Sequence, residues 1–231
     1  MKLLAFETAT EACSVALYID GEIIERFEIA PRRHAELSLP WADALLVEAG
    51  IAKSQLDAIA FGRGPGAFTG VRLAIALSQG IALALDRPLV PVSTLAVLAA
   101  QSDGARILAA IDARMGEIYT GTFLRDGNAL DATSSAAVMA PADYVLAGDD
   151  QDWHGVGTGF TAAEGRLQVR LAERFIHIDA TALPRAADLA RLAAQAYARG
   201  EAVAPELAEP AYLRNNVALT LEEQKALRAS R

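Results

Sequence analysis

The 231-residue chain has a single cysteine, Cys13, and only three histidines. One cysteine cannot form an internal disulfide, which is typical of a protein from a reducing compartment. The histidines are His34, His154 and His177, and none lies three or four residues from another histidine or from the cysteine. Because the spacing of a helical metal-ligand pair is lacking, the sequence predicts no metal site. We also expect no bound cofactor.

Basic residues are in the minority. The chain has 21 Lys and Arg against 29 Asp and Glu, which gives a formal net charge of −8. Phosphate contacts need clustered basic side chains, so this balance argues against a protein that binds nucleic acid alone. It leaves open an RNA that is reached through a more basic partner. With 53% hydrophobic and 22% charged residues, the composition is that of a globular protein.

Long apolar segments are also lacking. Only four apolar residues separate Lys2 from Glu7, too few for the hydrophobic region of a secretory signal. The longest apolar stretch, residues 71–85, has Ser78, Gln79 and Gly80 in its middle. It is shorter than the roughly 20 residues that a bilayer requires. We therefore expect a soluble, cytoplasmic protein.

Two segments of the chain, residues 2–21 and 106–127, resemble each other. Each has an apolar strand that ends in an acid, Glu7 or Asp112, followed by a short turn and a second strand. Each second strand ends in an Asp-Gly pair, at residues 20–21 and 126–127. Asp-Gly between extended runs predicts a β-hairpin, because glycine adopts the positive φ of the tight turn. The repeat predicts a duplicated domain.

Strands alternate with helices after each hairpin. We predict helices at about 34–49, 69–86, 94–100 and 184–198, with Pro184 in the first turn of the last one. Further strands are predicted at 57–62, 89–92, 107–110, 118–123 and 175–178. This order predicts an α/β fold with mixed sheets and two lobes, 1–103 and 104–216, followed by a tail, 217–231. We expect the helix at about 184–199 to pack back on the first lobe, a cleft between the lobes, and a short helix near Thr220 in the tail.

A glycine-rich loop, residues 62–72, lies between a predicted strand and a predicted helix. Such a loop lets backbone N–H groups approach an anion at the helix N-terminus. No Lys-Ser or Lys-Thr pair follows the glycines, so the loop is not a P-loop. Arg72 in the first helical turn opposes the helix dipole unless an anion or carboxylate lies nearby. The sequence favours a structural or partner-contact role for this loop and leaves direct anion binding open.

Nucleotide binding has weak candidates in both halves. Thr8 and Thr10 supply two hydroxyl groups to the turn after the first strand, but Glu11 beside them would repel a triphosphate. Gly157 and Gly159 belong to a glycine run that has no clear strand-helix-strand context. We treat ATP binding as the minor alternative.

No catalytic set is visible. Cys13 and Ser14 lie in a predicted strand without a neighbouring base, so nucleophilic catalysis has no local support. Glu7 and Asp112 have no visible metal ligand or basic partner, and we expect them to anchor their turns.

A stripe of small residues marks the second helix. Ala76, Gly80 and Ala84 recur at four-residue spacing, which places them on one side of a helix and lets another backbone approach closely. The sequence favours an internal contact for this stripe, and it is also the best candidate for a surface that binds another protein.

Five segments together resemble the TsaB (YeaZ) family in family order: residues 4–10, 34–40, 62–72, 112–119 and 210–214. The resemblance covers residues 1–216. It implies a duplicated actin-like fold of the acetate/sugar kinase–Hsp70–actin type, with two lobes. It also implies a role in forming N6-threonylcarbamoyladenosine at position 37 of tRNAs that read ANN codons.

In that family the transfer to tRNA is carried out by TsaD, a paralogue that holds a metal through histidines, and an ATPase, TsaE, joins the pair. The comparable stretch here, residues 93–99, has no histidine. The resemblance therefore implies a non-catalytic scaffold that stabilises TsaD, recruits TsaE, meets tRNA only through the complex, and forms a homodimer when alone. The alternative is a stand-alone ATP-dependent phosphotransferase or peptidase. The expected partner contact lies on the first two helices, at His34, Leu37, Trp41, Arg72, Ala76, Gly80 and Ala84.

Overall fold

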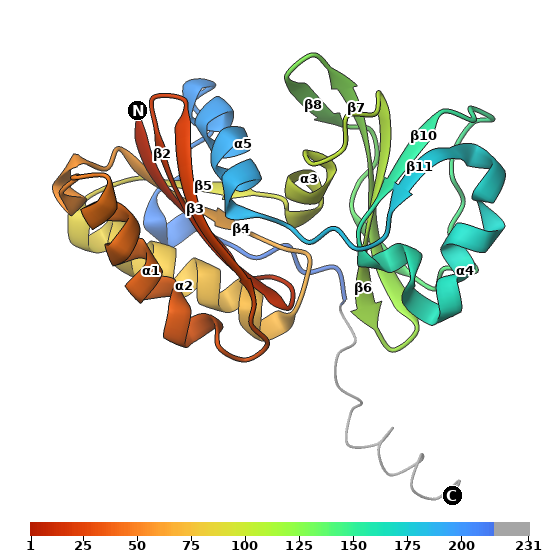
Figure 1. Ribbon diagram of the computed structural model, residues 1–231, viewed down its shortest axis with the longest axis horizontal. Helices are drawn as coiled ribbons and strands as arrows, with labels where there is room; N and C mark the ends of the chain where they lie inside the picture. The colour runs from red at the N-terminus through yellow and green to blue at the C-terminus, as the bar shows by residue number, and fades with distance from the viewer. Residues whose placement is uncertain (215–231) are drawn as a thin grey trace, which may run out of the picture.

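The computed structural model describes residues 1–214, which form two lobes that each contain a mixed β-sheet (Figure 1). The helix predicted near Thr220 lies outside the described residues. The first sheet has the strand order β3-β2-β1-β4-β5, in which β1, β4 and β5 pair in parallel, β2 pairs antiparallel with β1, and β3 pairs antiparallel with β2. Its strands are β1 (Lys2–Glu7), β2 (Ala12–Ile19), β3 (Glu22–Ile29), β4 (Ala58–Gly62) and β5 (Leu89–Val92).

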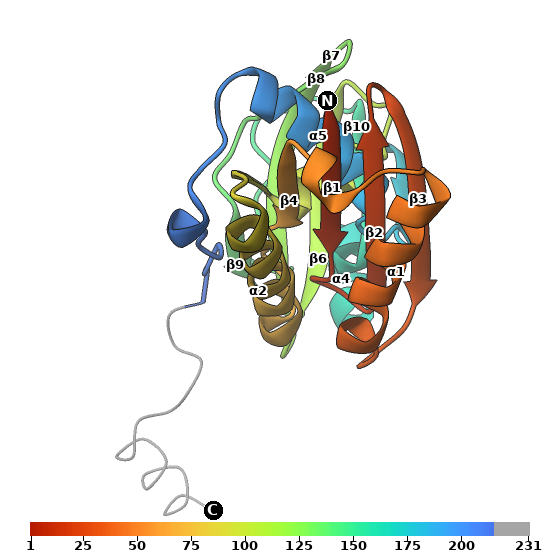
Figure 2. The same ribbon diagram turned by 90° about the vertical axis from the view of Figure 1, so that its left-hand side faces the viewer.

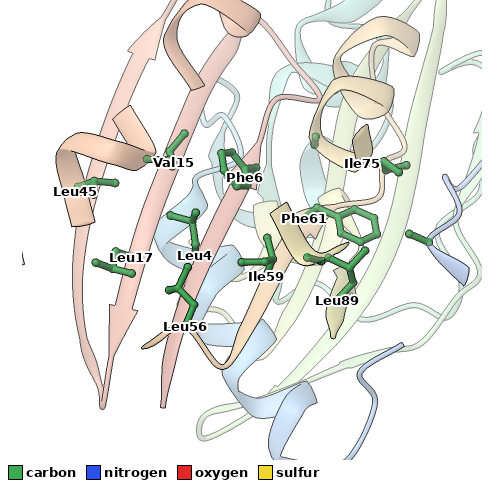
Figure 3. Packing of buried hydrophobic residues seen from close by; sticks show 14 of the residues in the cluster. Leu4, Phe6, Val15, Leu17, Leu45, Leu56, Ile59, Phe61, Ile75 and Leu89 are labelled. Atoms are coloured by element: carbon green, nitrogen blue, oxygen red, sulfur yellow. The ribbon is translucent and has the colours of Figure 1, made fainter. Parts of the chain in front are cut away.

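Helices cover both faces of the first sheet. Alternate side chains of a strand point to opposite faces, so Leu4 and Phe6 of β1 pack under α1 (His34–Glu48) and α2 (Phe68–Leu85), as Figure 3 shows. Leu3 and Ala5 face the other way and pack against α5 (Ala186–Ala198). The core of this lobe therefore depends on a helix that comes from the far end of the chain.

The second sheet has the strand order β11-β10-β6-β7-β8, and β9 pairs with β7. The short helix α3 (Thr94–Ala99) covers the face toward the first lobe, and α4 (Ala162–Arg170) lies on the other face (Figure 1). Its strands are β6 (Arg106–Arg114), β7 (Glu117–Asp126), β8 (Ala129–Ala132), β9 (Ala137–Met139), β10 (Trp153–Val156) and β11 (Phe175–Asp179). Single 3-10 turns lie at η1 (Lys53–Gln55), η2 (Thr158–Phe160), η3 (Ala172–Arg174) and η4 (Pro205–Leu207).

Residues 201–214, which we call the strap, run back over the first lobe to the second, as seen at the edge of the molecule in Figure 2. Hydrogen bonds hold the strap at four places: Val203 N to Leu89 O (2.8 Å), Gln79 Nε2 to Pro205 O (2.8 Å), Ala211 N to Arg63 O (2.8 Å) and Arg214 Nη2 to Ala113 O (3.3 Å). The strap therefore fastens the two lobes to each other.

Most predicted elements of the fold are confirmed. The helices α1, α2 and α3 begin within one residue of their predicted starts, and Asp20 and Gly21 form the expected tight turn with φ of 48° and 108°. The prediction for α5 is wrong at its start, because Pro184 and Arg185 precede the helix and Arg185 is extended. The division at residues 103 and 104 stays a prediction.

One helix among the described residues, α2, is long and apolar enough by length and composition to cross a membrane. It has 18 residues, three more than the apolar stretch noted in the sequence. Its inner side packs on the first sheet through Val71, Ala74 and Ile75, as a core helix does.

Candidate functional site

A cleft of about 580 Å³ lies between the lobes. The first lobe lines it with the β1–β2 turn, the start of α1 and the start of α2, and the second lobe with the β6–β7 turn and Thr158. Of the four weak candidates for nucleotide binding, Thr8 and Thr10 line the cleft, as a ligand-binding residue must. Gly157 and Gly159 do not line it.

Glu7 ends β1 behind this cleft, and its side chain is buried. Its Oε1 atom accepts the N–H of Ala9 (2.9 Å), and its Oε2 atom accepts the hydroxyl of Thr94 (3.2 Å). Burial raises the pKa of Glu7 to about 7, and the hydrogen bonds from Ala9, Thr94 and Thr8 reduce the rise. The prediction that this acid anchors its turn is confirmed.

The hydrogen-bond donors of the β1–β2 turn are largely committed within the protein. The Thr8 hydroxyl donates to Gly70 O (2.7 Å), and the N–H of Ala12 donates to the Thr10 hydroxyl (3.3 Å). The N–H of Ala9 is held by Glu7. A phosphate group that used the Thr8 hydroxyl or the N–H of Ala9 would have to displace an existing bond, and Glu11 on the same wall would repel it.

Three glycines of the glycine-rich loop let it lie directly against β1 and its turn. A Cβ atom at Gly62 would lie 2.0 Å from Glu7 Oε2, and at Gly70 2.0 Å from Thr8 O. At Gly66 it would lie 2.4 Å from Ala9 O, and the next residue, Ala67, donates its N–H to that same oxygen (2.7 Å). These contacts support the structural interpretation of the loop over direct anion binding.

The opposite wall of the cleft is also internally bonded. Asp112 accepts the N–H of Arg114 (2.8 Å) and forms an ion pair with its side chain (3.1 Å), which confirms Asp112 as a turn anchor. The Thr158 hydroxyl accepts the N–H of Asp112 (3.1 Å). A Cβ atom at Gly157 or Gly159 would meet Ala110 at 2.3 Å and 2.6 Å, so these glycines allow close packing on β6.

The glycine run at 155–159 does have the strand-helix-strand context that the sequence analysis denied it. Strands β10 and β11 pair in parallel, and α4 lies between them in the chain. That prediction was wrong because β10 has four residues, including Gly155, and gives no periodic signal.

Histidine and cysteine do not form a catalytic set in the described part of the chain. His34 Nε2 lies 3.0 Å from Thr10 O and 3.1 Å from Ala12 O, so this ring fastens the β1–β2 turn to α1. Cys13 is buried in β2, and burial raises the pKa of its thiol, the opposite of what a nucleophile needs.

His154 and His177 are not isolated from each other. Neighbouring positions on β10 and β11 bring their ring centroids to 5.9 Å. The pairing could not be read from residues 23 positions apart without the strand register. Within residues 1–214, no group of three or more His, Cys, Asp or Glu side chains is placed to hold a metal ion.

The outer surface of α2 carries the predicted stripe. Ala76, Gly80 and Ala84 are exposed, and a Cβ atom built on Gly80 would meet nothing within 4 Å. The preference for an internal contact was therefore wrong, because the helix packs inward through a different side. Two exposed apolar residues that the sequence analysis missed, Phe68 (60%) and Leu83 (67%), extend this surface.

The three residues predicted on α1 lie at its inner edge. His34, Leu37 and Trp41 are half-buried, and Trp41 packs against the core under the helix. The apolar residues that α1 presents to solvent are Leu39 (46%) and Val47 (81%). Helical spacing alone could have placed both of them beside the predicted residues.

The comparisons with known proteins agree with one another. Residues 26–221 match the family model described as TsaD: tRNA N6-adenosine threonylcarbamoyltransferase. The chain is 43% identical to a tRNA threonylcarbamoyladenosine biosynthesis protein TsaB from Escherichia coli, covering 94% of this chain and 96% of the relative. It is 36% identical to the TsaB of Haemophilus influenzae, over 94% and 95% of the two chains.

A solved structure, YeaZ from Pseudomonas aeruginosa, superposes with a TM-score of 0.83. It is 46% identical and covers 92% of this chain and 99% of its own. The agreement in fold identifies the two lobes as the duplicated actin-like architecture.

Proposed function

The chain belongs to the TsaB family, and from this we propose that it is a non-catalytic scaffold subunit in the formation of N6-threonylcarbamoyladenosine at A37 of ANN-decoding tRNAs. In this role it stabilises the catalytic TsaD subunit and recruits TsaE. The observation that carries the proposal is the outer surface of α2, where exposed small and apolar residues form a face that no described residue covers.

The partner surface comprises the outer side of α2 and, on α1, the half-buried edge that carries the predicted residues. A helix face of small residues allows a second helix to approach closely, and its apolar area is released from water on contact. The assigned residues are His34, Leu37, Trp41, Arg72, Ala76, Gly80 and Ala84. In the absence of TsaD the same surface pairs two copies of this chain. The complex works in the cytoplasm and meets tRNA through its other subunits, which suits the net charge of −8.

The rival function is an enzyme of the same fold, either an ATP-dependent phosphotransferase or a peptidase. A related solved structure from Pseudomonas aeruginosa carries the description "an uncharacterized protein with similarity to peptidase YEAZ". The committed donors of the β1–β2 turn and the buried thiol of Cys13 support the scaffold over both enzymes.

A drop-out reconstitution tests the proposal. The reaction contains tRNA, threonine, bicarbonate, ATP and the other proteins of the system, with or without this chain, and modified adenosine is measured. We expect product only when this chain is present, and none from this chain with the threonylcarbamoyl-AMP-forming enzyme alone. Equal product without the chain contradicts the scaffold, and product from the chain without TsaD favours the enzyme.

A further inference from the structure

Arg72 is the only charged residue among the 18 residues of α2. It lies one turn before Ala76 and two turns before Gly80, on the exposed side of the helix. The surface that the proposed function assigns to a partner therefore contains a single positive charge, at its N-terminal end.

Two aromatic rings hold the Arg72 guanidinium in place. Its Cζ atom lies 3.2 Å from the centroid of Phe68 and 4.8 Å from that of Tyr212 in the strap. One of its five N–H groups has an acceptor, because Nη1 donates to Phe68 O at 3.4 Å. Phe68 is 60% exposed and Tyr212 53% exposed, so the stack stands at the surface.

No carboxylate pairs with Arg72 among residues 1–214. Glu206 and Glu209 of the strap form no ion pair with it. Eight of the 16 arginines among residues 1–214 form an ion pair with a carboxylate, and Arg72 belongs to the other eight. The stacking fixes the plane of the guanidinium. Its other N–H groups have no hydrogen-bond acceptor in the described part of the chain, residues 1–214.

We propose that Arg72 is the receptor for a carboxylate on the protein that covers the outer surface of α2. This inference rests on the proposed function. A partner that covers the helix removes the guanidinium from water, and a buried cation is costly unless an anion with matching geometry replaces the lost hydration. A guanidinium whose plane is already fixed loses little entropy on binding, and its paired N–H groups match the two oxygens of a carboxylate.

The strap belongs to this surface as well. Tyr212 supplies one of the two rings, and the side chain of Leu207, which is 64% exposed, lies on the same segment. Gln79 of α2 donates to Pro205 O, which fixes the strap along the edge of the helix. An aromatic–arginine cluster beside an apolar face is the composition of an interface hot spot.

The test is the dissociation constant of the complex with TsaD for the wild type and for the variants R72A, R72K and Y212A. We expect R72A to weaken binding by roughly 30-fold or more and to reduce its dependence on salt. R72K should give a smaller loss, since it keeps the charge and loses the fork. Y212A should weaken binding by about 2- to 5-fold, because one stacking partner of the cation is removed. The matched control is R166A, which removes an exposed arginine from α4 on the second lobe.

The carboxylate itself is found by replacing exposed Asp and Glu residues of TsaD with Asn and Gln. One of these replacements should lose as much affinity as R72A, and the two losses should not add in the double variant. If R72A binds within twofold of the wild type, or if no acid of TsaD couples to it, the carboxylate receptor is overturned.

The proposed function fails in a different way. If the wild type forms no complex with TsaD, the partner surface itself is wrong. G80R separates the two cases, because an arginine in the middle of the stripe blocks close approach of any partner. Loss of binding in G80R together with wild-type binding in R72A keeps the surface and rejects the carboxylate alone.

Discussion

The buried carboxyl group of Glu7 lies against three segments of the first 100 residues. Its carboxyl group contacts the turn after β1, the end of β4 at Gly62 and the start of α3 at Thr94. The Thr94 hydroxyl donates to Glu7 and accepts the N–H of Gly64 (3.2 Å), which continues the chain of hydrogen bonds into the glycine-rich loop. The protonation state of Glu7 therefore affects the hydrogen bonds that connect β1, α3 and the glycine-rich loop.

The raised pKa of Glu7 predicts a pH dependence of stability. The folded state holds the proton up to about pH 7 and the unfolded state only to about pH 4.5. The contribution is fully present below pH 4.5 and is lost as the pH rises through 7, which lowers the free energy of unfolding by about 3 kcal/mol. Glu7→Gln should remove this fall, because an amide has no proton to lose in this range. Urea denaturation of the wild type and of Glu7→Gln between pH 4.5 and 8 measures the free energy of unfolding.

Glu11→Gln is the control for Glu7→Gln, because it removes a negative charge from the half-buried, cleft-lining side of the same turn. If Glu7→Gln keeps the full fall in stability of the wild type between pH 4.5 and 7, another group titrates and the assignment to Glu7 is wrong.

Helix α2 contains two glycines with opposite surroundings. Gly70 lies against the backbone oxygen of Thr8, whereas Gly80 faces open space. Gly70→Ala should destabilise the protein by roughly 2–4 kcal/mol, because a backbone carbonyl cannot move aside cheaply. Gly80→Ala should stabilise it by about 0.5–1 kcal/mol through helix propensity. Thermal unfolding of the two variants checks both values, and equal effects would contradict the packing at Gly70.

The elements that the sequence predicted well are those with strong local signals. The helix α1 follows from apolar spacing, and the turn at Asp20 from the φ that glycine permits. The sequence could not show which side of α2 faces the sheet, because leucine, isoleucine and alanine occur on both sides of the helix. Periodicity needs a polar side to orient a helix.

The residues of the candidate site also divide into those that local sequence signals predicted and those that they did not. Glu7 and Asp112 were predicted as turn anchors from their place at strand ends. The contact between Gly70 and Thr8 spans 62 residues, and the stack of Arg72 on Tyr212 spans 140, so neither leaves a local pattern. The position of Arg72 against the helix dipole was the one signal of an unusual environment.

At the scale of the whole molecule, the cleft has the location of a ligand site, but the Thr8 hydroxyl and the N–H of Ala9 on its first wall already donate to Gly70 and Glu7. We expect that 1 mM Mg-ATP neither releases heat on titration nor raises the melting temperature, since a ligand that binds only the folded state would stabilise it by mass action. A rise of several degrees at this concentration would contradict the scaffold and return attention to Thr8, Thr10 and Arg114.

The second lobe is an insertion between α3 and α5, and this order governs how the protein is made. The inner face of the first sheet, with Leu3, Ala5 and Val90, is complete once β5 has left the ribosome, but α5 begins about 90 residues later. At ordinary elongation rates that interval lasts roughly 5–20 s. During this interval α5 does not yet cover the apolar face of the newly made sheet. The nascent chain therefore exposes to chaperones a surface that is buried in the finished protein.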